Sequence, residues 1–300
     1  MKRGRVEDPM HPRLRIGASS WSAPSWEGVF YPPGTPPADY LPYYAGRLDT
    51  VEVDATFYRT PGERMVDAWR ERTPTGFVFA AKFPRTITHE SLLVNCAVEC
   101  GTFLKSMDRL GDKLGPLLLQ FRYFRKDEFP DPKPFLDRLE VFLTGLPRGR
   151  RYAVEVRNKS FVNARLLDLL RRNGAALALI DHPWFFGIEP LMRRSDVLTA
   201  DFAYVRWLGD RRAIEQKTTR WDRLIVDRTR DMGRWIPAIR TILDRGLTVY
   251  GYFNNHYAGY AIGSIDMFRS LWEGTGGAVG GGAGALSASG APGGSGSPGR

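Results

Sequence analysis

Short apolar segments rich in β-branched residues alternate along this chain with amphipathic segments of helical period. Eight of the apolar segments have the length and composition of buried β-strands. They cover residues 14–18, 50–53, 77–81, 116–121, 152–156, 176–180, 203–207 and 248–253. Helical patterns lie between them, near residues 37–46, 64–72, 100–110, 132–143 and 164–173, then at 219–244 with a break at Pro237, and finally up to Trp272.

This repeated strand–helix pattern predicts parallel βα units. Eight such units in a chain of this length close most naturally as a barrel, so we expect an α/β fold of the closed (β/α)₈ TIM type. The competing fold is an open doubly wound sheet, which favours a glycine-rich phosphate loop after its first strand. Residues 17–20, Gly-Ala-Ser-Ser, do not form such a loop.

The two ends of the chain differ from the rest. Residues 1–13 are polar and basic without periodicity, and residues 274–300 are almost entirely Gly, Ala, Ser and Pro. Such compositions bury too little apolar surface to offset chain entropy, so we expect a disordered basic arm, a barrel over 14–273 and a disordered tail. The tail glycines follow no strand and open no helix, which excludes a nucleotide loop.

The chain carries a formal net charge of +10. A basic surface favours phosphate-bearing partners, either a small anion or a nucleic acid. Much of the excess lies in the N-terminal arm and in pairs such as Arg171-Arg172 and Arg193-Arg194, so an ordinary solvated surface is the alternative. The two cysteines, Cys96 and Cys100, lack the companions of a disulfide framework or a zinc site.

The N-terminal segment and the absence of long apolar runs in the sequence predict the cellular compartment of the protein. Residues 1–15 are basic and contain no apolar core, unlike a secretion signal. No apolar run approaches the roughly 18 residues that a membrane span needs. We therefore expect a cytoplasmic protein that does not cross a membrane.

Charged residues occupy the ends of several predicted strands, where a barrel places its active site. Side chains of a strand alternate between its two faces, so Glu52 shares a face with Asp54, and Glu155 shares one with Arg157. The opposite faces are β-branched and suit the helix layer, which leaves the charged faces pointing into the barrel mouth. A charge there is costly unless it is paired or used.

These strand ends predict one polar site that favours anions. The candidate catalytic residues are Glu52, Glu155 and Arg157. The candidate substrate-binding residues are Lys82, His89, Gln120, Arg206, Asn254, Asn255 and His256. The alternative for each charge is a salt bridge that fills the barrel. The aromatic residues near the mouth, Trp21, Tyr31, Tyr58 and Trp184, serve either as rim packing or as stacking platforms.

Seven segments, in the right order between residues 14 and 272, resemble the YecE-like family, also called domain of unknown function 72. They are residues 16–21 (IGASSW), 28–32 (GVFYP), 50–58 (TVEVDATFY), 82–84 (KFP) with Thr88-His89, 111–116 (GDKLGP) with Gln120, 204–206 (YVR) with Gly209, and 252–256 (YFNNH). The resemblance implies a TIM-type barrel, related in shape to sugar isomerases and abasic-site endonucleases. It implies no established reaction.

Three departures from the family pattern concern the mouth. The resemblance leads us to expect Asn-Ser where Asp54-Ala55 stands, and Pro-Pro where Phe121-Arg122-Tyr123 stands. It also implies Glu-Phe-Arg-His followed by Ser-Trp, where this chain has residues 155–158 (EVRN) and 160–161 (SF). The Glu and the Arg remain, while the missing His removes one candidate acid/base group.

Three functions are compatible with this pattern. The first is an enzyme, a hydrolase or isomerase, that acts on a phosphate or sugar phosphate through the cationic mouth and a carboxylate acid/base. The second is metal-dependent hydrolysis or isomerisation, with a divalent metal as the possible cofactor. Its candidate ligands are Glu52, Glu155, Asp181, His182 and His256. The third is a non-catalytic nucleic-acid binder that uses the basic arm and rim.

Overall fold

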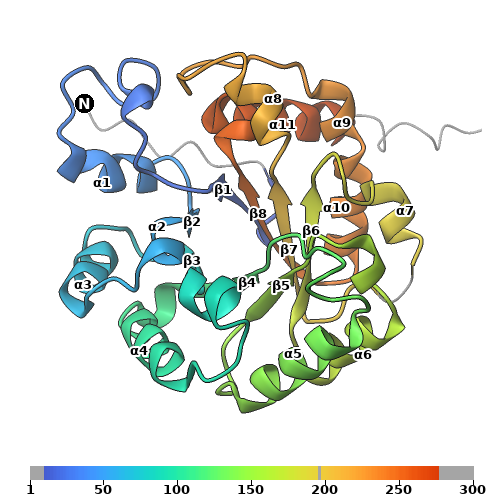
Figure 1. Ribbon diagram of the computed structural model, residues 1–300. Helices are drawn as coiled ribbons and strands as arrows, with labels where there is room; N and C mark the ends of the chain where they lie inside the picture. The colour runs from blue at the N-terminus through green and yellow to red at the C-terminus, as the bar shows by residue number, and fades with distance from the viewer. Residues whose placement is uncertain (1–9, 195–196, 277–300) are drawn as a thin grey trace, which may run out of the picture.

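Eight parallel strands form one sheet in the order β1-β8-β7-β6-β5-β4-β3-β2 in the computed structural model, which describes residues 10–194 and 197–276 (Figure 1). The strands are β1 Leu14–Ala18, β2 Thr50–Val53, β3 Val78–Lys82, β4 Leu114–Gln120, β5 Tyr152–Glu155, β6 Ala176–Asp181, β7 Phe202–Trp207 and β8 Thr248–Phe253. All eight predicted strands are present, with ends within two residues of those expected. The predicted α/β barrel is therefore confirmed.

A tyrosine hydroxyl bridges the two edge strands of this sheet, β1 and β2. The Tyr44 hydroxyl accepts a hydrogen bond from the Ala18 amide at 2.8 Å and donates one to the Thr50 carbonyl at 3.0 Å. At Gly17 a side chain would place its Cβ 2.1 Å from the Thr50 carbonyl oxygen, so only glycine permits this approach. The barrel is thus nearly closed, with a side chain replacing ladder hydrogen bonds at the seam.

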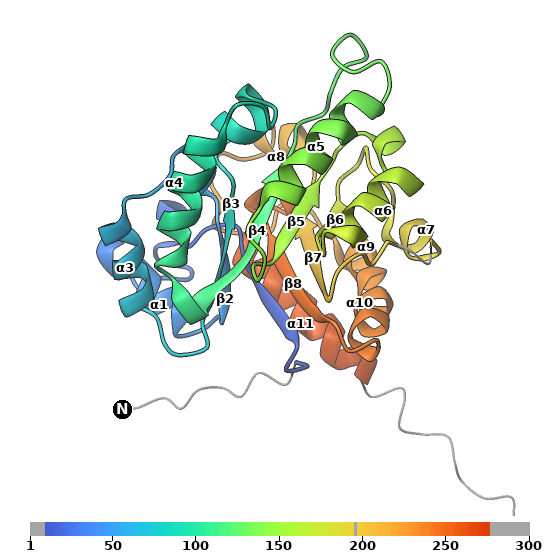
Figure 2. The same cartoon turned by 90° about the horizontal axis from the view of Figure 1, so that it is seen from below.

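The helices surround the sheet (Figures 1 and 2). They are α1 Tyr40–Ala45, α2 Ala55–Tyr58, α3 Glu63–Glu71, α4 Ala97–Asp108, α5 Lys133–Gly145, α6 Ala164–Arg172, α7 Ile188–Met192, α8 Arg211–Glu215, α9 Thr229–Gly233, α10 Trp235–Asp244 and α11 Ala261–Gly276. Helix α6 begins and ends as predicted, because Asn163 accepts from the Leu166 amide and Gly174 has a positive φ of 61°. Cys96 and Cys100 are buried free thiols.

The helical region predicted over 219–244, with a break at Pro237, is wrong in its start and in the position of its break. Helix formation begins only at Thr229, and the chain then divides into α9 and α10 at Arg234. Polar side chains bind the backbone nearby and compete with a helix, since Thr218 accepts from the Arg220 amide. Pro237 lies in the first turn of α10, where a missing amide hydrogen costs nothing, so it causes no break.

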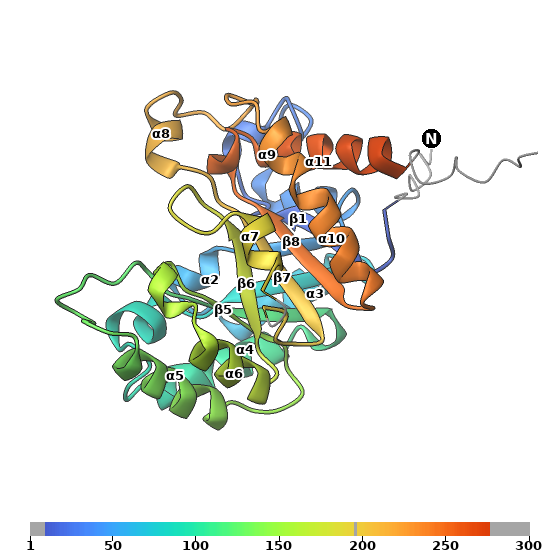
Figure 3. The same cartoon turned by 90° about the vertical axis from the view of Figure 1, so that its right-hand side faces the viewer.

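The loops after β4 and β7 project from one end of the barrel, and both ends of the described chain lie at the other (Figure 3). Met10, which lies within the segment assigned to the disordered arm, is buried. The predictions for residues 1–9 and 277–300 lie outside the described residues. Among the described helices, none combines the length and the apolar character needed to cross a membrane.

Candidate functional site

Arg206 occupies the centre of the barrel and is almost fully buried. The Nη1 of Arg206 donates to Glu155 Oε2 and, at 2.8 Å, to Gln120 Oε1. Its Nη2 donates to Glu52 Oε1 at 2.9 Å. Strands β2 and β5 thus each bring a carboxylate to the same guanidinium, because strand alternation turns both side chains inward.

Glu52 has two further partners inside the barrel. The Tyr204 hydroxyl donates to Glu52 Oε2 at 2.7 Å. Lys82 Nζ lies 3.4 Å from Glu52 Oε1 and also forms an ion pair with Asp54. Glu52 and Lys82 are buried, whereas Asp54 is partly exposed. This arrangement satisfies the buried charges from several sides, as a low-dielectric interior requires.

The central network is balanced in charge. Its three carboxylates and three cations are Glu52, Asp54 and Glu155, and Lys82, Arg157 and Arg206. The cationic mouth expected from the sequence therefore has no net charge at its centre. Any attraction for an anion must come from cations outside this network or from unused donors within it.

Burial alone would raise the pKa of Glu52, but the charges of Arg206 and Lys82 outweigh it and lower this pKa to about 2. Burial opposes a lower pKa for Glu155 in the same way, and Arg206 and Arg157 prevail there too. Both carboxylates are therefore ionised at neutral pH. A general acid or base works best with a pKa near the operating pH, so this geometry favours a positioning role for both residues.

Arg157 is the cation of the network with unused donors. Its Nε donates to Glu155 Oε1 at 3.0 Å, which orients the guanidinium. About a third of its side chain, 32%, is exposed. Within the described part of the chain, neither terminal nitrogen of Arg157 has a hydrogen-bond partner. A phosphate or carboxylate accepts two parallel hydrogen bonds from the N–H groups of such a planar guanidinium fork.

His89 lies on a π-helical turn, Thr86–Glu90, that follows β3. Burial, and then the positive charges of Arg122, Arg157 and Arg85, lower the pKa of His89 to about 4. Three cations from three loops thus act on one point of the mouth. At neutral pH His89 is uncharged, so its ring nitrogens offer one donor and one acceptor.

The backbone directly after His89 is strained. Leu92, Leu93 and Asn95 have positive φ angles of 45°, 68° and 53°. A left-handed conformation costs a bulky L-residue about 1–2 kcal/mol. Strained residues and π-helical turns concentrate at functional sites, where the surrounding structure holds them in place. The β3–α4 loop therefore has the backbone features of a functional loop.

His182 follows β6 and lies within electrostatic reach of the same arginine. Burial, and then the charge of Arg157, lower the pKa of His182. Its Nδ1 accepts from the Trp184 amide at 3.3 Å, and its ring packs edge-on against the Trp184 indole at 5.6 Å. We refer to His89, Arg157 and His182 as the mouth cluster.

Asn254, Asn255 and His256 bind mainly to their own loop. Asn254 Oδ1 accepts from the His256 amide at 2.9 Å, and Asn255 Oδ1 accepts from the Ala261 amide at 2.9 Å. His256 Nε2 lies 3.2 Å from Glu215 Oε1 on α8. The side-chain carbonyls of both asparagines are thus occupied, while their NH₂ groups make no hydrogen bond to any described residue.

The candidate metal ligands do not come together. Asp181 accepts from Trp235 Nε1 at 2.8 Å in the helix layer, and the two glutamates bind cations. Over residues 10–194 and 197–276, no three His, Cys, Asp or Glu side chains converge in a way that could hold a metal ion. The ligand set expected from the strand ends is therefore corrected.

Sequence reasoning missed the Tyr204 hydroxyl, although Tyr204 precedes Arg206 by two residues and so shares its inward face. The mouth aromatics divide into two kinds. Tyr31 is buried and stacks on Tyr40 at 4.1 Å, which confirms packing. Tyr58 and Trp184 are exposed, at 65% and 75%.

Comparison with known proteins identifies the family. A family model described as "Protein of unknown function DUF72" matches residues 15–284. This chain belongs to the DUF72 family. The resemblance seen in the sequence motifs is thereby confirmed, and it carries no known reaction with it.

Curated and solved relatives of this DUF72 chain agree with that assignment. It is 34% identical over 149 residues to the UPF0759 protein YecE of Escherichia coli K12, an alignment that spans 49% of this chain and 50% of that protein. A DUF72 protein of Thermotoga maritima has a TM-score of 0.66 at 24% identity, covering 87% of this chain and 99% of its own. One from Enterococcus faecalis has a TM-score of 0.64 at 21% identity, covering 87% and 95%. Both solved structures support the fold.

Asn158 stands where the family resemblance implies a histidine. Its Oδ1 accepts from the Phe124 amide and its Nδ2 donates to the Phe124 carbonyl, both at 2.8 Å. Asn158 is buried. In this DUF72 chain the position therefore fixes the loop after β4, and it provides no titratable group.

Proposed function

We propose that this DUF72 barrel binds and acts on a phosphate-bearing substrate, of sugar-phosphate size, at the carboxyl end of its strands. The mouth cluster would hold the phosphate. The observation that carries this proposal is the guanidinium of Arg157, whose terminal nitrogens have no hydrogen-bond partner among the described residues. The charges of Arg157 and its neighbouring arginines also help to lower the pKa of His89 to about 4. A dianion at this point would relieve the repulsion among these cations.

Each group has a distinct role in this proposal. The two free nitrogens of Arg157 bind two phosphate oxygens as a fork. The buried carboxylate of Glu155 orients that fork and remains ionised. Lys82, Gln120 and Arg206 act through the buried network, since each already has a hydrogen-bond partner there.

The two histidines supply the proton chemistry in this proposal. His89 and His182 are both uncharged at neutral pH because burial and Arg157 lower their pKa values. The bound phosphate offsets the positive charges beside the two rings and raises both pKa values towards neutral pH, so each imidazole can accept a proton from a substrate hydroxyl or attacking water and later return it. In this proposal the NH₂ groups of Asn254 and Asn255 orient the remainder of the substrate. This arrangement suits hydrolysis or isomerisation of a sugar phosphate.

Thermal unfolding with a small ligand panel tests the proposal. Ribose 5-phosphate and inorganic phosphate are expected to raise the unfolding midpoint, while ribose at the same concentration leaves it unchanged. A ligand at one hundred times its Kd contributes about 2.7 kcal/mol of stability. Sodium sulfate and sodium chloride at matched ionic strength separate specific binding from general salt effects. Equal responses to ribose and ribose 5-phosphate would refute a phosphate site.

A further inference from the structure

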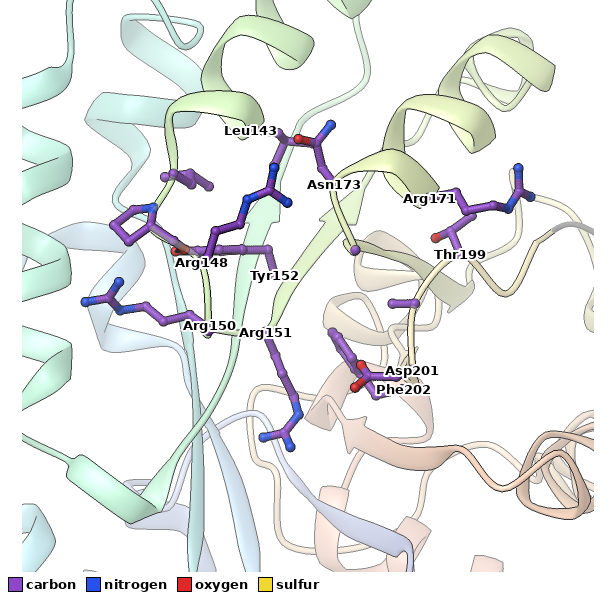
Figure 4. A pocket seen from close by; sticks show the side chains of 15 residues that line it. Leu143, Arg148, Arg150, Arg151, Tyr152, Arg171, Asn173, Thr199, Asp201 and Phe202 are labelled. Atoms are coloured by element: carbon purple, nitrogen blue, oxygen red, sulfur yellow. Dashed lines mark hydrogen bonds between the residues drawn. The ribbon is translucent and has the colours of Figure 1, made fainter.

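A groove of about 610 Å³ lies at the end of the barrel opposite the mouth, beneath the starts of β5, β6 and β7 (Figure 4). It is formed by the α5–β5 loop, the end of α6 and the segment that enters β7. Active sites of TIM barrels lie at the other face, so a role here concerns binding and not the barrel's chemistry.

Arginine dominates the charged lining of this groove. Arg148, Arg150 and Arg151 come from four consecutive residues before β5, and Arg171 comes from the end of α6 (Figure 4). Among the described residues, the lining contains one carboxylate, Asp201. We refer to this surface as the arginine groove.

The four arginines are held to different degrees, and Arg171 pairs with Asp168 at 2.7 Å. Arg150 makes a two-pronged ion pair with Asp108, at 2.8 and 2.6 Å, which fixes its guanidinium beside the groove. Arg151 lies with its Cζ 5.9 Å from the ring centroid of Tyr250. Arg148 is exposed and makes no side-chain hydrogen bond or ion pair within the described residues. The groove therefore presents both fixed and free cations.

A second hollow on the same end of the barrel provides a contrast. Between α3 and α4, three cations face three carboxylates: Arg70, Arg109 and Lys113, and Asp67, Glu71 and Asp112. That hollow is balanced in charge. In the arginine groove, Asp108 and Asp168 pair with Arg150 and Arg171, so its positive excess rests on Arg148 and Arg151 against Asp201. The positive excess is thus local to the groove and is not a general property of this end.

The partner is indicated by what the groove lining lacks. None of the large exposed apolar side chains of the described residues lines it. A surface without them has nothing to insert into a lipid layer. It also has no exposed aromatic ring on which the unpaired bases of a single strand would stack. Arginines alone bind the phosphate backbone and carry no sequence readout.

We propose that the arginine groove binds the phosphodiester backbone of a nucleic acid duplex without reading its sequence. The basic net charge of +10 provides the long-range attraction for such a partner. The groove and the mouth lie at opposite ends of the barrel, so this binding is independent of the proposed phosphate substrate.

Fluorescence anisotropy with a labelled 20-base-pair duplex and the full chain tests the proposal. The double variant Arg148→Glu/Arg151→Glu is expected to bind at least tenfold more weakly than the wild type in 100 mM salt. Removing one arginine from a phosphate reduces the slope of log K against log salt by about 0.9, so the slope falls by nearly two. Circular dichroism checks that the variant is folded.

The matched control is Arg64→Glu/Arg230→Glu, which makes the same charge change at exposed arginines of α3 and α9. We expect less than a twofold effect on duplex binding from the control, and none from Arg157→Ala in the mouth. Equal losses in both double variants would show diffuse attraction and overturn the proposal. Absent duplex binding, tighter binding of the single strand, or displacement by anionic vesicles would overturn it as well.

Discussion

Replacing Arg206 with Met is expected to lower the free energy of unfolding by about 3–5 kcal/mol at pH 7, the usual cost of stranding buried charges. Glu52 and Glu155 both lose their central partner, and both are fully buried. Lys82 still faces Glu52, and Arg157 still faces Glu155, so the variant keeps one cation beside each carboxylate. Urea denaturation of the wild type and the variant measures the difference.

The pH dependence of this difference identifies its cause. In the wild type the pKa of Glu52 is lowered to about 2, so its contribution to stability is complete above about pH 5 and is lost as the pH falls towards 2. Without Arg206 the pKa of each glutamate rises, and protonation near pH 5 removes part of the penalty. The deficit of the variant should therefore shrink between pH 7 and pH 5.

The partly exposed pair of Arg122 and Glu128 supplies the control for this experiment. Arg122→Met removes a bidentate partner, with hydrogen bonds of 2.7 and 2.5 Å, from a carboxylate that solvent still reaches. Ion pairs in contact with solvent contribute about 0–1 kcal/mol, so we expect a small loss of stability there. Arg206→Met with wild-type stability, or with a loss no larger than that of Arg122→Met, would contradict the role given to the buried network.

Arg157→Ala is expected to weaken phosphate binding at least about thirtyfold, since truncating a hydrogen-bonded charge costs about 2 kcal/mol or more. The variant should unfold at nearly the same temperature as the wild type. Glu155 keeps Arg206 as a buried partner, and Arg157 is itself partly exposed. Isothermal titration with ribose 5-phosphate and thermal unfolding measure the two effects separately.

Two further variants sharpen the interpretation of Arg157→Ala. Arg157→Lys keeps the charge but loses the planar fork, so it should recover only part of the affinity. Arg64→Ala removes the same charge from an exposed position of α3, outside both proposed sites, and should leave phosphate affinity unchanged. A collapse of the fold in Arg157→Ala would make Arg157 a structural residue, and unchanged affinity would remove it from the site.

Strand alternation was enough to predict which charges point inward. Glu52, Glu155 and Arg206 each lie on the inner face expected from the sequence, and all three are buried. Their pairing could not be predicted, because residues far apart in the chain meet on one guanidinium only after the barrel closes. Strand alternation predicts to which face a side chain points, whereas the contact of both glutamates with Arg206 depends on the register of three separate strands.

The electrostatics of His89 were also beyond sequence reasoning. Its lowered pKa depends on burial and on Arg122 and Arg157, which come from the ends of β4 and β5. The strained backbone at Leu92 and Leu93 has no sequence signal either, because leucine does not favour positive φ. The asparagines after β8 show the opposite case, since their conspicuous motif mainly supports a turn.

The central claim is that cations at the mouth hold a phosphate beside His89. Proton NMR of the histidine rings at several pH values, with and without inorganic phosphate, tests it most directly, because the chain has only four histidines. We predict a pKa of about 4 for His89 without phosphate and a clear rise with phosphate, since the bound anion offsets the charges of Arg122 and Arg157. The His11 resonances should not respond to phosphate. A His89 that titrates near 6.5 in both conditions would contradict the account.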